Sequence, residues 1–151
     1  MSERIKLFAG IRSDGSSVYE EVHVERLGDS RFRVEQSPGL VLGIAAGDVV
    51  EVAKDAVARV VSRGGNISIQ VYAKKDCLEV EGALLKLLPR LNGRIDGTTA
   101  DILVLTIPVS SGFLDIERML RGLVKIFPQV EWFFGNVYDP IDGTTPLNWW
   151  K

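Results

Sequence analysis

The chain has 151 residues, of which 46% are hydrophobic and 25% are charged, so it can bury the core of one compact domain. Its 18 basic and 20 acidic residues give a formal net charge of −2, which excludes the broad positive surface that nucleic acid or an anionic membrane attracts. No apolar run approaches a membrane span, and the single cysteine, Cys77, excludes an intrachain disulfide and fits the reducing cytoplasm, where we expect the protein to act.

The first 65 residues predict short strands separated by turns. Apolar and charged side chains alternate over residues 18–26 and 31–34, and glycine-containing turn clusters precede both runs. Further apolar strands are expected over residues 49–52 and 57–61. Short strands with turn signals at this spacing are typical of a small, strongly bent sheet or barrel.

Residues 66–72 form the clearest strand, because apolar and polar side chains alternate directly after the Gly64-Gly65 break. The pattern then changes to a helical period. Asp76 and Glu79 have the spacing of a capping box at the start of a helix. One apolar stripe on this helix comprises Val80, Leu84, Leu87, Leu88 and Leu91.

The remaining elements follow in quick succession. Residues 94–96 predict a short strand that enters a tight hairpin turn at Asp96-Gly97, within the run 94–99. Residues 102–107 are apolar on both faces, which is typical of a central strand. A second amphipathic helix is expected over residues 112–126 and a last strand over residues 130–134.

From residue 66 onward the predicted order is strand, helix, strand, strand, helix, strand, which is the ferredoxin-like unit. We therefore predict an α+β fold packed as one compact structural unit. It comprises an N-terminal small bent β-sheet or barrel (1–65), a ferredoxin-like βαββαβ unit (66–136) and a C-terminal aromatic tail (137–151). The two most apolar runs fall on the first and third strands, which lie in the middle of such a sheet.

The turn glycines and strand valines of the first half resemble a known bacterial family, the small proteins grouped as domain of unknown function 4265. The resemblance covers most of residues 5–135. It is carried by Leu27-Gly28-Asp29, Phe32, Val34, Ser37-Pro38, Gly43, Gly47-Asp48-Val49-Val50, Arg59-Val60-Val61, Gly65 and Ser68-Ile69-Gln70-Val71. It implies no assigned activity and no functional residue. The resemblance also implies that relatives occur in settings that suggest partners of bacterial toxins.

Residues 139–145, Asp-Pro-Ile-Asp-Gly-Thr-Thr, are similar to the Mg²⁺-binding signature of the inositol monophosphatase family. Carboxylate oxygens suit such a hard cation. That family also needs acidic ligands upstream and a long α/β segment downstream, whereas six residues follow Thr145. The letters Ile-Asp-Gly-Thr-Thr recur at 95–99, where we expect a hairpin turn. We therefore predict a turn at 139–145, with no metal and no cofactor, and keep a Mg-dependent phosphatase as a remote alternative.

Other candidates for catalysis are isolated. His23 is the only histidine and shares a strand face with Glu21 and Glu25, which is typical of a solvated side chain. Cys77 follows the expected helix start, where packing is the simpler role. Tyr72 is the only aromatic residue on the two central strands, whereas RNA-binding sheets of this kind stack bases on several. We predict no catalytic residue and no nucleic-acid partner.

Aromatic residues gather near the end of the chain. More than half of them, including all three tryptophans, lie between residues 127 and 150. Two interpretations stay open: a tail strapped across the sheet completes the core, or some rings anchor another protein within an acidic rim. The predicted partner-binding residues are Glu131, Trp132, Phe134, Tyr138, Asp139, Asp142, Trp149 and Trp150.

These observations favour a non-enzymatic, cytoplasmic protein-binding module. The specific hypothesis is an immunity-type inhibitor that binds and occludes a bacterial toxin, the partner that the family resemblance implies. The alternative from another class is a regulatory domain that binds a small molecule between the two halves. No membrane partner is expected, and the sequence leaves the oligomeric state open.

Overall fold

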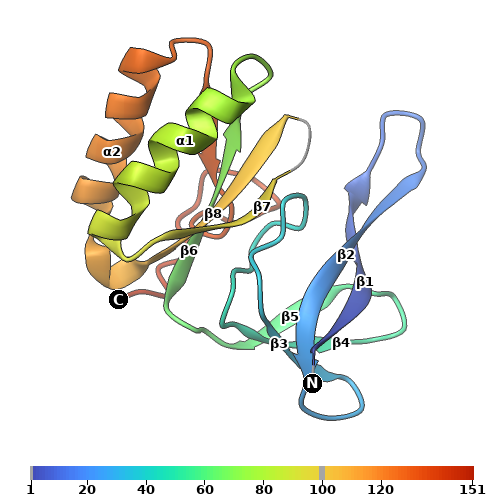
Figure 1. The fold of residues 1–151 in the computed structure, drawn as a ribbon. Helices are drawn as coiled ribbons and strands as arrows, with labels where there is room; N and C mark the ends of the chain where they lie inside the picture. The colour runs from blue at the N-terminus through green and yellow to red at the C-terminus, as the bar shows by residue number, and fades with distance from the viewer. Residues whose placement is uncertain (1, 99–100) are drawn as a thin grey trace.

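The computed structural model describes residues 2–98 and 101–151, and its mixed α+β architecture confirms the predicted fold class (Figure 1). One antiparallel sheet contains β1 (Ser2–Ile11), β2 (Ser17–Arg26), β3 (Arg31–Val34), β4 (Val49–Val52) and β5 (Ala58–Ser62). The other contains β6 (Asn66–Tyr72), β7 (Arg94–Thr98), β8 (Ile102–Pro108) and β9 (Glu131–Phe134). The helical segments are α1 (Cys77–Leu87), α2 (Phe113–Ile126) and the 3₁₀ turns η1 (Leu88–Leu91) and η2 (Val109–Ser111). No helix among these residues is long and apolar enough to cross a bilayer.

The first sheet follows the chain order β1-β2-β3-β4-β5. The Phe8 N–H donates to the Ala56 carbonyl at 2.8 Å, which joins β1 to the segment just before β5. Alternation along the strands sends apolar side chains to the inner face. The buried cluster there comprises Leu7, Val22, Val24, Phe32, Val34, Val41, Ile44 and Val50.

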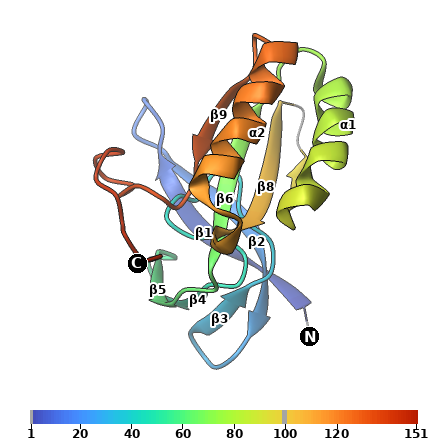
Figure 2. The same ribbon diagram turned by 90° about the vertical axis from the view of Figure 1, so that its left-hand side faces the viewer.

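The second sheet has the order β7-β8-β6-β9, so the two most apolar strands occupy its centre as the sequence predicts. The helices α1 and α2 cover one face of this sheet (Figure 2). Ile69 pairs with Leu105 in the central register, and both side chains are fully buried against the helices. Burying each such side chain contributes about 1.5–3 kcal/mol, so this layer supplies much of the folding free energy.

The start of α1 differs from the predicted capping box. Asp76 has the left-handed conformation, with φ of 60°, and its side chain makes no capping hydrogen bond. Its carboxylate instead accepts a hydrogen bond from Gln129 Nε2 at 3.1 Å, which ties the helix start to the segment before β9. Asp76 is the N-cap residue, as the sequence predicts, but the predicted side-chain cap is wrong, because a tertiary partner binds the carboxylate.

The predicted hairpin turn at Asp96-Gly97 is also wrong, because β7 continues through both residues. The register passes from Ile95 opposite Leu105 to Gly97 opposite Val104, so Asp96 is the extra residue of a β-bulge. The bulge turns its side chain inward, where it is only 4% exposed. The connection to β8 comes later, and Thr99, which the sequence assigned to the turn, lies outside the described residues.

The segment 35–48, between β3 and β4, packs on the face of the second sheet that the helices leave free. Ser37 Oγ lies 2.6 Å from Thr106 Oγ1, and the Ser37 N–H donates to the Asp96 carboxylate at 2.8 Å. Gln70 Nε2 donates to the Pro38 carbonyl at 3.4 Å. The polar side chains of the central strands are therefore buried under the first half of the chain.

A second junction forms around Asp48, whose side chain is almost fully buried. Its carboxylate accepts hydrogen bonds from the main-chain N–H groups of Ala45 at 3.0 Å and Gly64 at 2.9 Å, and from Arg63 at 3.3 Å. Burial raises the pKa of Asp48, while these donors act in the opposite direction. A Cβ atom at Gly64 would lie 2.4 Å from the main chain of Gly47, so only glycine allows this close crossing.

We predict that Asp96→Ala lowers the free energy of unfolding by about 1–3 kcal/mol, because it leaves the buried Ser37 N–H and Thr106 hydroxyl without their acceptor. Denaturant unfolding monitored by circular dichroism measures this change. The matched control is Asp29→Ala, at an exposed turn, where the change should stay within about 0.5 kcal/mol. Equal effects of the two substitutions would contradict a structural role for the bulge.

Candidate functional site

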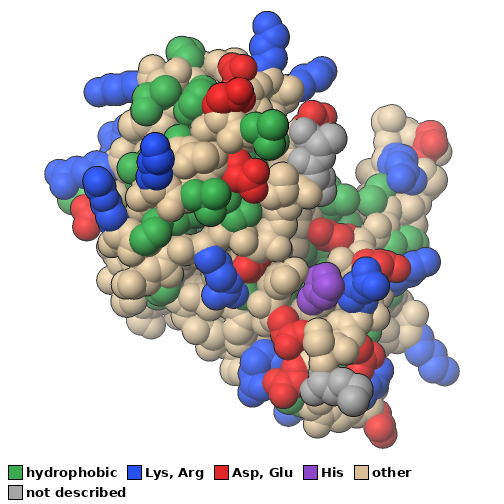
Figure 3. All heavy atoms as spheres, viewed as in Figure 1, with side chains coloured by type: hydrophobic (Ala, Val, Ile, Leu, Met, Phe, Trp, Pro, Cys, Tyr) green, Lys and Arg blue, Asp and Glu red, His purple; other side chains and the backbone are tan. Residues whose placement is uncertain are grey.

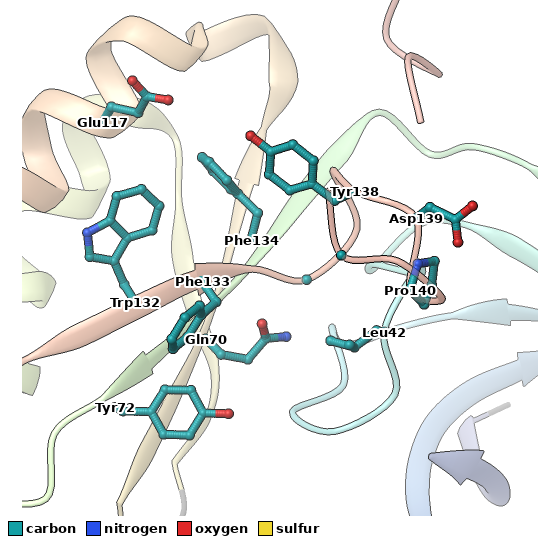
Figure 4. Close-up of a pocket in the computed structure, with 12 residues that line it drawn as sticks. Leu42, Gln70, Tyr72, Glu117, Trp132, Phe133, Phe134, Tyr138, Asp139 and Pro140 are labelled. Atoms are coloured by element: carbon teal, nitrogen blue, oxygen red, sulfur yellow. The ribbon is translucent and has the colours of Figure 1, made fainter. Parts of the chain in front are cut away.

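A groove of about 540 Å³ follows β9 along the edge of the second sheet (Figure 4). Its walls come from α2, β6, β9, the segment before β4 and the C-terminal tail, so five parts of the chain meet there. We call it the β9 groove. Its lining residues are Leu42, Gln70, Tyr72, Glu117, Trp132, Phe133, Phe134, Gly135, Tyr138, Asp139, Pro140 and Gly143.

Strand alternation distributes the aromatic side chains of β9 to both walls. Trp132 pairs with Val71 and Phe134 with Ile69, so these two side chains share the face that the helices cover. Phe133 pairs with Gln70 and points to the opposite face. Figure 4 shows the result, with Trp132 and Phe134 on one side of the strand and Phe133 on the other.

The groove exposes large apolar side chains that the fold could have buried. Phe133 is 53% exposed, Leu42 is 48% exposed, and Tyr72 and Tyr138 are each 39% exposed. Phe133 and Tyr72 contact each other edge to face, with ring centroids 5.6 Å apart. Contiguous apolar surface of this kind marks a binding site more often than isolated exposed residues do.

The charged side chains that line the groove are both acidic. Glu117 projects from α2 and Asp139 from the tail. The neighbouring hollow at the start of β9 is mixed in charge, because Glu131 lies there with Lys74 and Lys75. The acidic character is therefore confined to the aromatic part of the edge.

The last two tryptophans pack against the body of the protein. Trp149 Nε1 donates to the Asn136 carbonyl at 2.8 Å, and the Arg63 guanidinium lies 5.5 Å from the centre of the Trp149 ring. Trp150 contacts Phe113 on α2, with ring centroids 5.1 Å apart. Both side chains are half-buried, and they hold the tail against the second sheet behind the groove.

Residues 139–145 form a compact turn. The Asp139 N–H donates to the Thr145 carbonyl and the Gly143 N–H to the Asp139 carbonyl, each at 2.8 Å. The Asp142 carboxylate accepts hydrogen bonds from the N–H groups of Thr144 and Thr145 and from the Thr145 hydroxyl. These bonds lower the pKa of Asp142 to about 2, with the Thr145 hydroxyl as the largest cause. Within residues 2–98 and 101–151, no three carboxylate, histidine or cysteine side chains group in a way that could hold a metal ion.

A second cavity, of about 390 Å³, opens between the two halves and is lined in part by His23, Glu20 and Asp96. The carboxylates already have partners within the chain. Glu20 accepts hydrogen bonds from three consecutive N–H groups, those of residues 39–41, and Asp96 accepts from Ser37, Arg94 and Thr106. These carboxylates stabilise the junction between the halves.

Comparison with known proteins gives a family and a fold. The family model described as "Domain of unknown function (DUF4265)" matches residues 20–125, well over half of the chain. The chain belongs to the DUF4265 family. A crystal structure of a hypothetical protein from Neisseria gonorrhoeae is similar to this DUF4265 protein, with a TM-score of 0.66 and 14% sequence identity, over 89% of this chain and 94% of the other. That likeness concerns the fold alone. A comparison with curated proteins finds no match.

The β9 groove contains half of the predicted binding residues of this DUF4265 protein. Trp132, Phe134, Tyr138 and Asp139 line it together. Glu131 lies in the neighbouring hollow. The remaining three lie elsewhere: Asp142 in its own turn, and Trp149 and Trp150 against the body. The family match ends before β9, so it assigns no role to the aromatic side chains of this strand.

Eight lining residues escaped the sequence prediction, and four of them, Phe133, Tyr72, Leu42 and Glu117, bear on the proposed site. Phe133 and Tyr72 carried a usable signal, because strand alternation places Phe133 on the Gln70 side and Tyr72 on that same face of β6. Leu42 and Glu117 carried none. They come from a loop of the first half and from α2, and only the tertiary structure brings them to the same edge.

We predict that Thr145→Val raises the pKa of Asp142 from about 2 toward its ordinary value of 3.8, because the hydroxyl of Thr145 is the main cause of the lowered value. The carboxylate therefore stabilises the turn above pH 4, and this contribution is lost as the pH falls toward 2. Carbon NMR of the Asp142 carboxyl measures both proteins. Thr144→Val is the control and should have a smaller effect. Micromolar Mg²⁺ binding that Asp142→Ala abolishes would instead support the metal-site alternative.

Proposed function

We propose that this DUF4265 protein is a non-enzymatic protein-binding module that uses the β9 groove. One observation carries the proposal: exposed apolar and aromatic side chains from three separate segments, Leu42, Tyr72 and Phe133, converge on one hollow. Tyrosine and tryptophan are the residue types that dominate binding hot spots, and Tyr72, Trp132 and Tyr138 supply them here. Rings already fixed by their neighbours also lose little conformational freedom on binding.

Binding is better supported than catalysis by the state of the carboxylates in and near the hollows. Glu20, Asp96 and Asp142 each accept at least three hydrogen bonds from donors within the chain, which occupy most of their acceptor sites. A general base or a metal ligand needs a free oxygen facing the substrate or ion. The known partners of these carboxylates support structural roles.

The specific form that we propose is an immunity-type inhibitor that blocks a bacterial toxin by occlusion. The resemblance to the DUF4265 family supports a toxin as partner, and the acidic residues Glu117 and Asp139 suit a basic surface on it. The proposed setting is the cytoplasm, which the unpaired Cys77 supports.

We also infer that β6 to β9, with α1 and α2, form a ferredoxin-like unit. The order β7-β8-β6-β9, with antiparallel neighbours and both helices on one face, supports this interpretation. In the first half, the hydrogen bond from Phe8 to Ala56 supports a barrel-like closure of the sheet.

A second candidate function is a regulatory domain that binds a small molecule between the two halves. The cavity of about 390 Å³ favours it, because its size suits a small metabolite and His23 contributes an imidazole to its wall. Figure 3 shows the molecule from the side on which a notch separates the β1–β2 hairpin from the helical half.

For the leading proposal, which expects a cognate toxin encoded by a neighbouring gene, we predict that Phe133→Ala weakens binding to that toxin by about tenfold or more and reduces protection of cells that express it. Isothermal titration calorimetry and growth assays measure the two effects. Loss of the most exposed ring in the groove removes apolar contact area without disturbing the core.

The matched control is Tyr19→Ala. Tyr19 is 51% exposed against 53% for Phe133, and it contacts Phe8 edge to face much as Phe133 contacts Tyr72. It lies on β2, and it does not line the groove. Unchanged toxin affinity in Phe133→Ala, or an equal loss in both variants, would contradict the proposed surface.

For the second candidate, a compound in a metabolite panel should raise the melting temperature only if it binds the folded state. At a hundredfold excess over Kd, such a ligand adds about 2.7 kcal/mol to the free energy of unfolding. Differential scanning fluorimetry measures the shift. The expected result for an occluding inhibitor is no shift. A shift that His23→Leu removes would place a ligand in the cavity between the halves and favour regulation over inhibition.

A further inference from the structure

The two sheets have four edge strands, and in the described residues three of them carry features that block pairing with another strand. β1 has charged residues at Glu3, Arg4 and Lys6, and its Phe8 N–H is already bonded to Ala56. β5 has a charged residue, Arg59, directly after its first residue. β7 has a bulge with an inward-pointing charge, Asp96. Charges, bulges and coverage are the devices by which proteins protect sheet edges.

In the structure described, the edge of β9 is the least protected of the four, because its one charge, Glu131, lies at its first residue and the other three residues are aromatic. Its sequence is Glu-Trp-Phe-Phe, without lysine, proline or bulge, and its named strand partner is β6 alone. An aromatic edge left open in this way is a template for a further strand. Only its short length limits the pairing.

The phase of the pairing shows which main-chain groups are free. The Gly135 N–H donates to the Ser68 carbonyl at 2.7 Å, so Gly135 faces β6. In an antiparallel ladder every second residue faces the same neighbour, so Phe133 also faces β6. The N–H and C=O groups of Trp132 and Phe134 therefore point away from β6, along the floor of the β9 groove.

The walls of the groove match the side-chain pattern of an added strand. Successive side chains of an extended segment point to opposite faces of the sheet. One set would meet Trp132 and Glu117, and the other would meet Phe133 and Leu42, on the two sides of β9 seen in Figure 4.

Charge selects the occupant. Glu117 and Asp139 are the charged residues that line the groove, and Glu131 begins the strand. Among the described residues, Arg121 pairs with Glu117 at 3.8 Å in an exposed contact that contributes little, and Lys74 and Lys75 lie only near Glu131, in the neighbouring hollow. A second copy of this chain would bring the same acidic residues together, which is unfavourable, whereas lysine or arginine in a different partner would be attracted.

We propose that an extended, basic segment of the partner protein adds to the second sheet as a fifth strand, antiparallel or parallel to β9, through the main-chain groups of Trp132 and Phe134. This inference rests on the proposed protein-binding function and names the kind of surface that the partner supplies. The added strand would bury the exposed rings of both walls and satisfy the open edge in one step.

The test uses the full chain and a synthetic peptide, acetyl-Lys-Val-Arg-Leu-Lys-Val-Arg-amide, in which basic and apolar residues alternate. NMR hydrogen exchange should show the amides of Trp132 and Phe134 slowed about tenfold or more at saturation, with little change at Phe133. Methylating the peptide nitrogens that face β9 should abolish binding, while methylating the alternate nitrogens should leave it. An analogue with glutamate in place of lysine and arginine should not bind.

Several results would overturn strand addition. These are binding without protection of Trp132 and Phe134, equal binding of the acidic analogue, no binding at about 1 mM peptide, or protection without peptide in a self-associated dimer seen by sedimentation. The proposed function is separable from this outcome. If toxin binding depends on Phe133 while the amides of Trp132 and Phe134 stay unprotected in the toxin complex, the binding module stands and strand addition falls.

Discussion

The structure depends on the way β6 is enclosed on both faces. Ile67, Ile69 and Val71 pack against the helices, while Ser68 and Gln70 are buried under a loop from the first half of the chain. Each buried polar group there has a hydrogen-bond partner, which removes the desolvation cost that would otherwise oppose burial. Because the central part of this strand is covered on both faces, the exposed rings Tyr72 and Phe133 lie toward the β9 edge of the second sheet.

This enclosure explains why the aromatic surface of the β9 groove lies at the edge of the sheet. A sheet of this topology that binds nucleic acid presents an open face with aromatic residues on its central strands. Here the corresponding face carries Ser68, Gln70 and Thr106, and it is covered by residues near Ser37 and Pro38. The aromatic surface lies instead on the edge strand, beside the rings that anchor the tail. Within the tail, Trp149 and Trp150 pack against the core, as the first interpretation predicts, while Tyr138 lines the open groove.

The two local predictions that failed have the same physical cause. Asp96-Gly97 has the composition of a tight turn and Asp76 has the spacing of an N-cap, and both assignments assume that an aspartate bonds to its own neighbourhood. In the folded chain Asp96 bonds to Ser37 and Thr106, and Asp76 bonds to Gln129. In both cases the aspartate accepts hydrogen bonds from donors that are distant in sequence, and the local sequence pattern does not indicate these donors. The related motif at 139–145 behaves as predicted, because the exposed Asp142 meets only the donors of its own turn.

By itself the sequence determined the α+β class, the two helices, and the central places of β6 and β8, because hydrophobic periodicity is a local property that burial enforces. It also located an aromatic segment around Trp132 and Phe134. Only the tertiary structure decided which rings are open and which are packed, since this depends on Leu42 and Glu117 arriving from other elements and on β9 lying at an edge. Exposure is a property of the assembled layers, and residues far apart in the chain set it jointly.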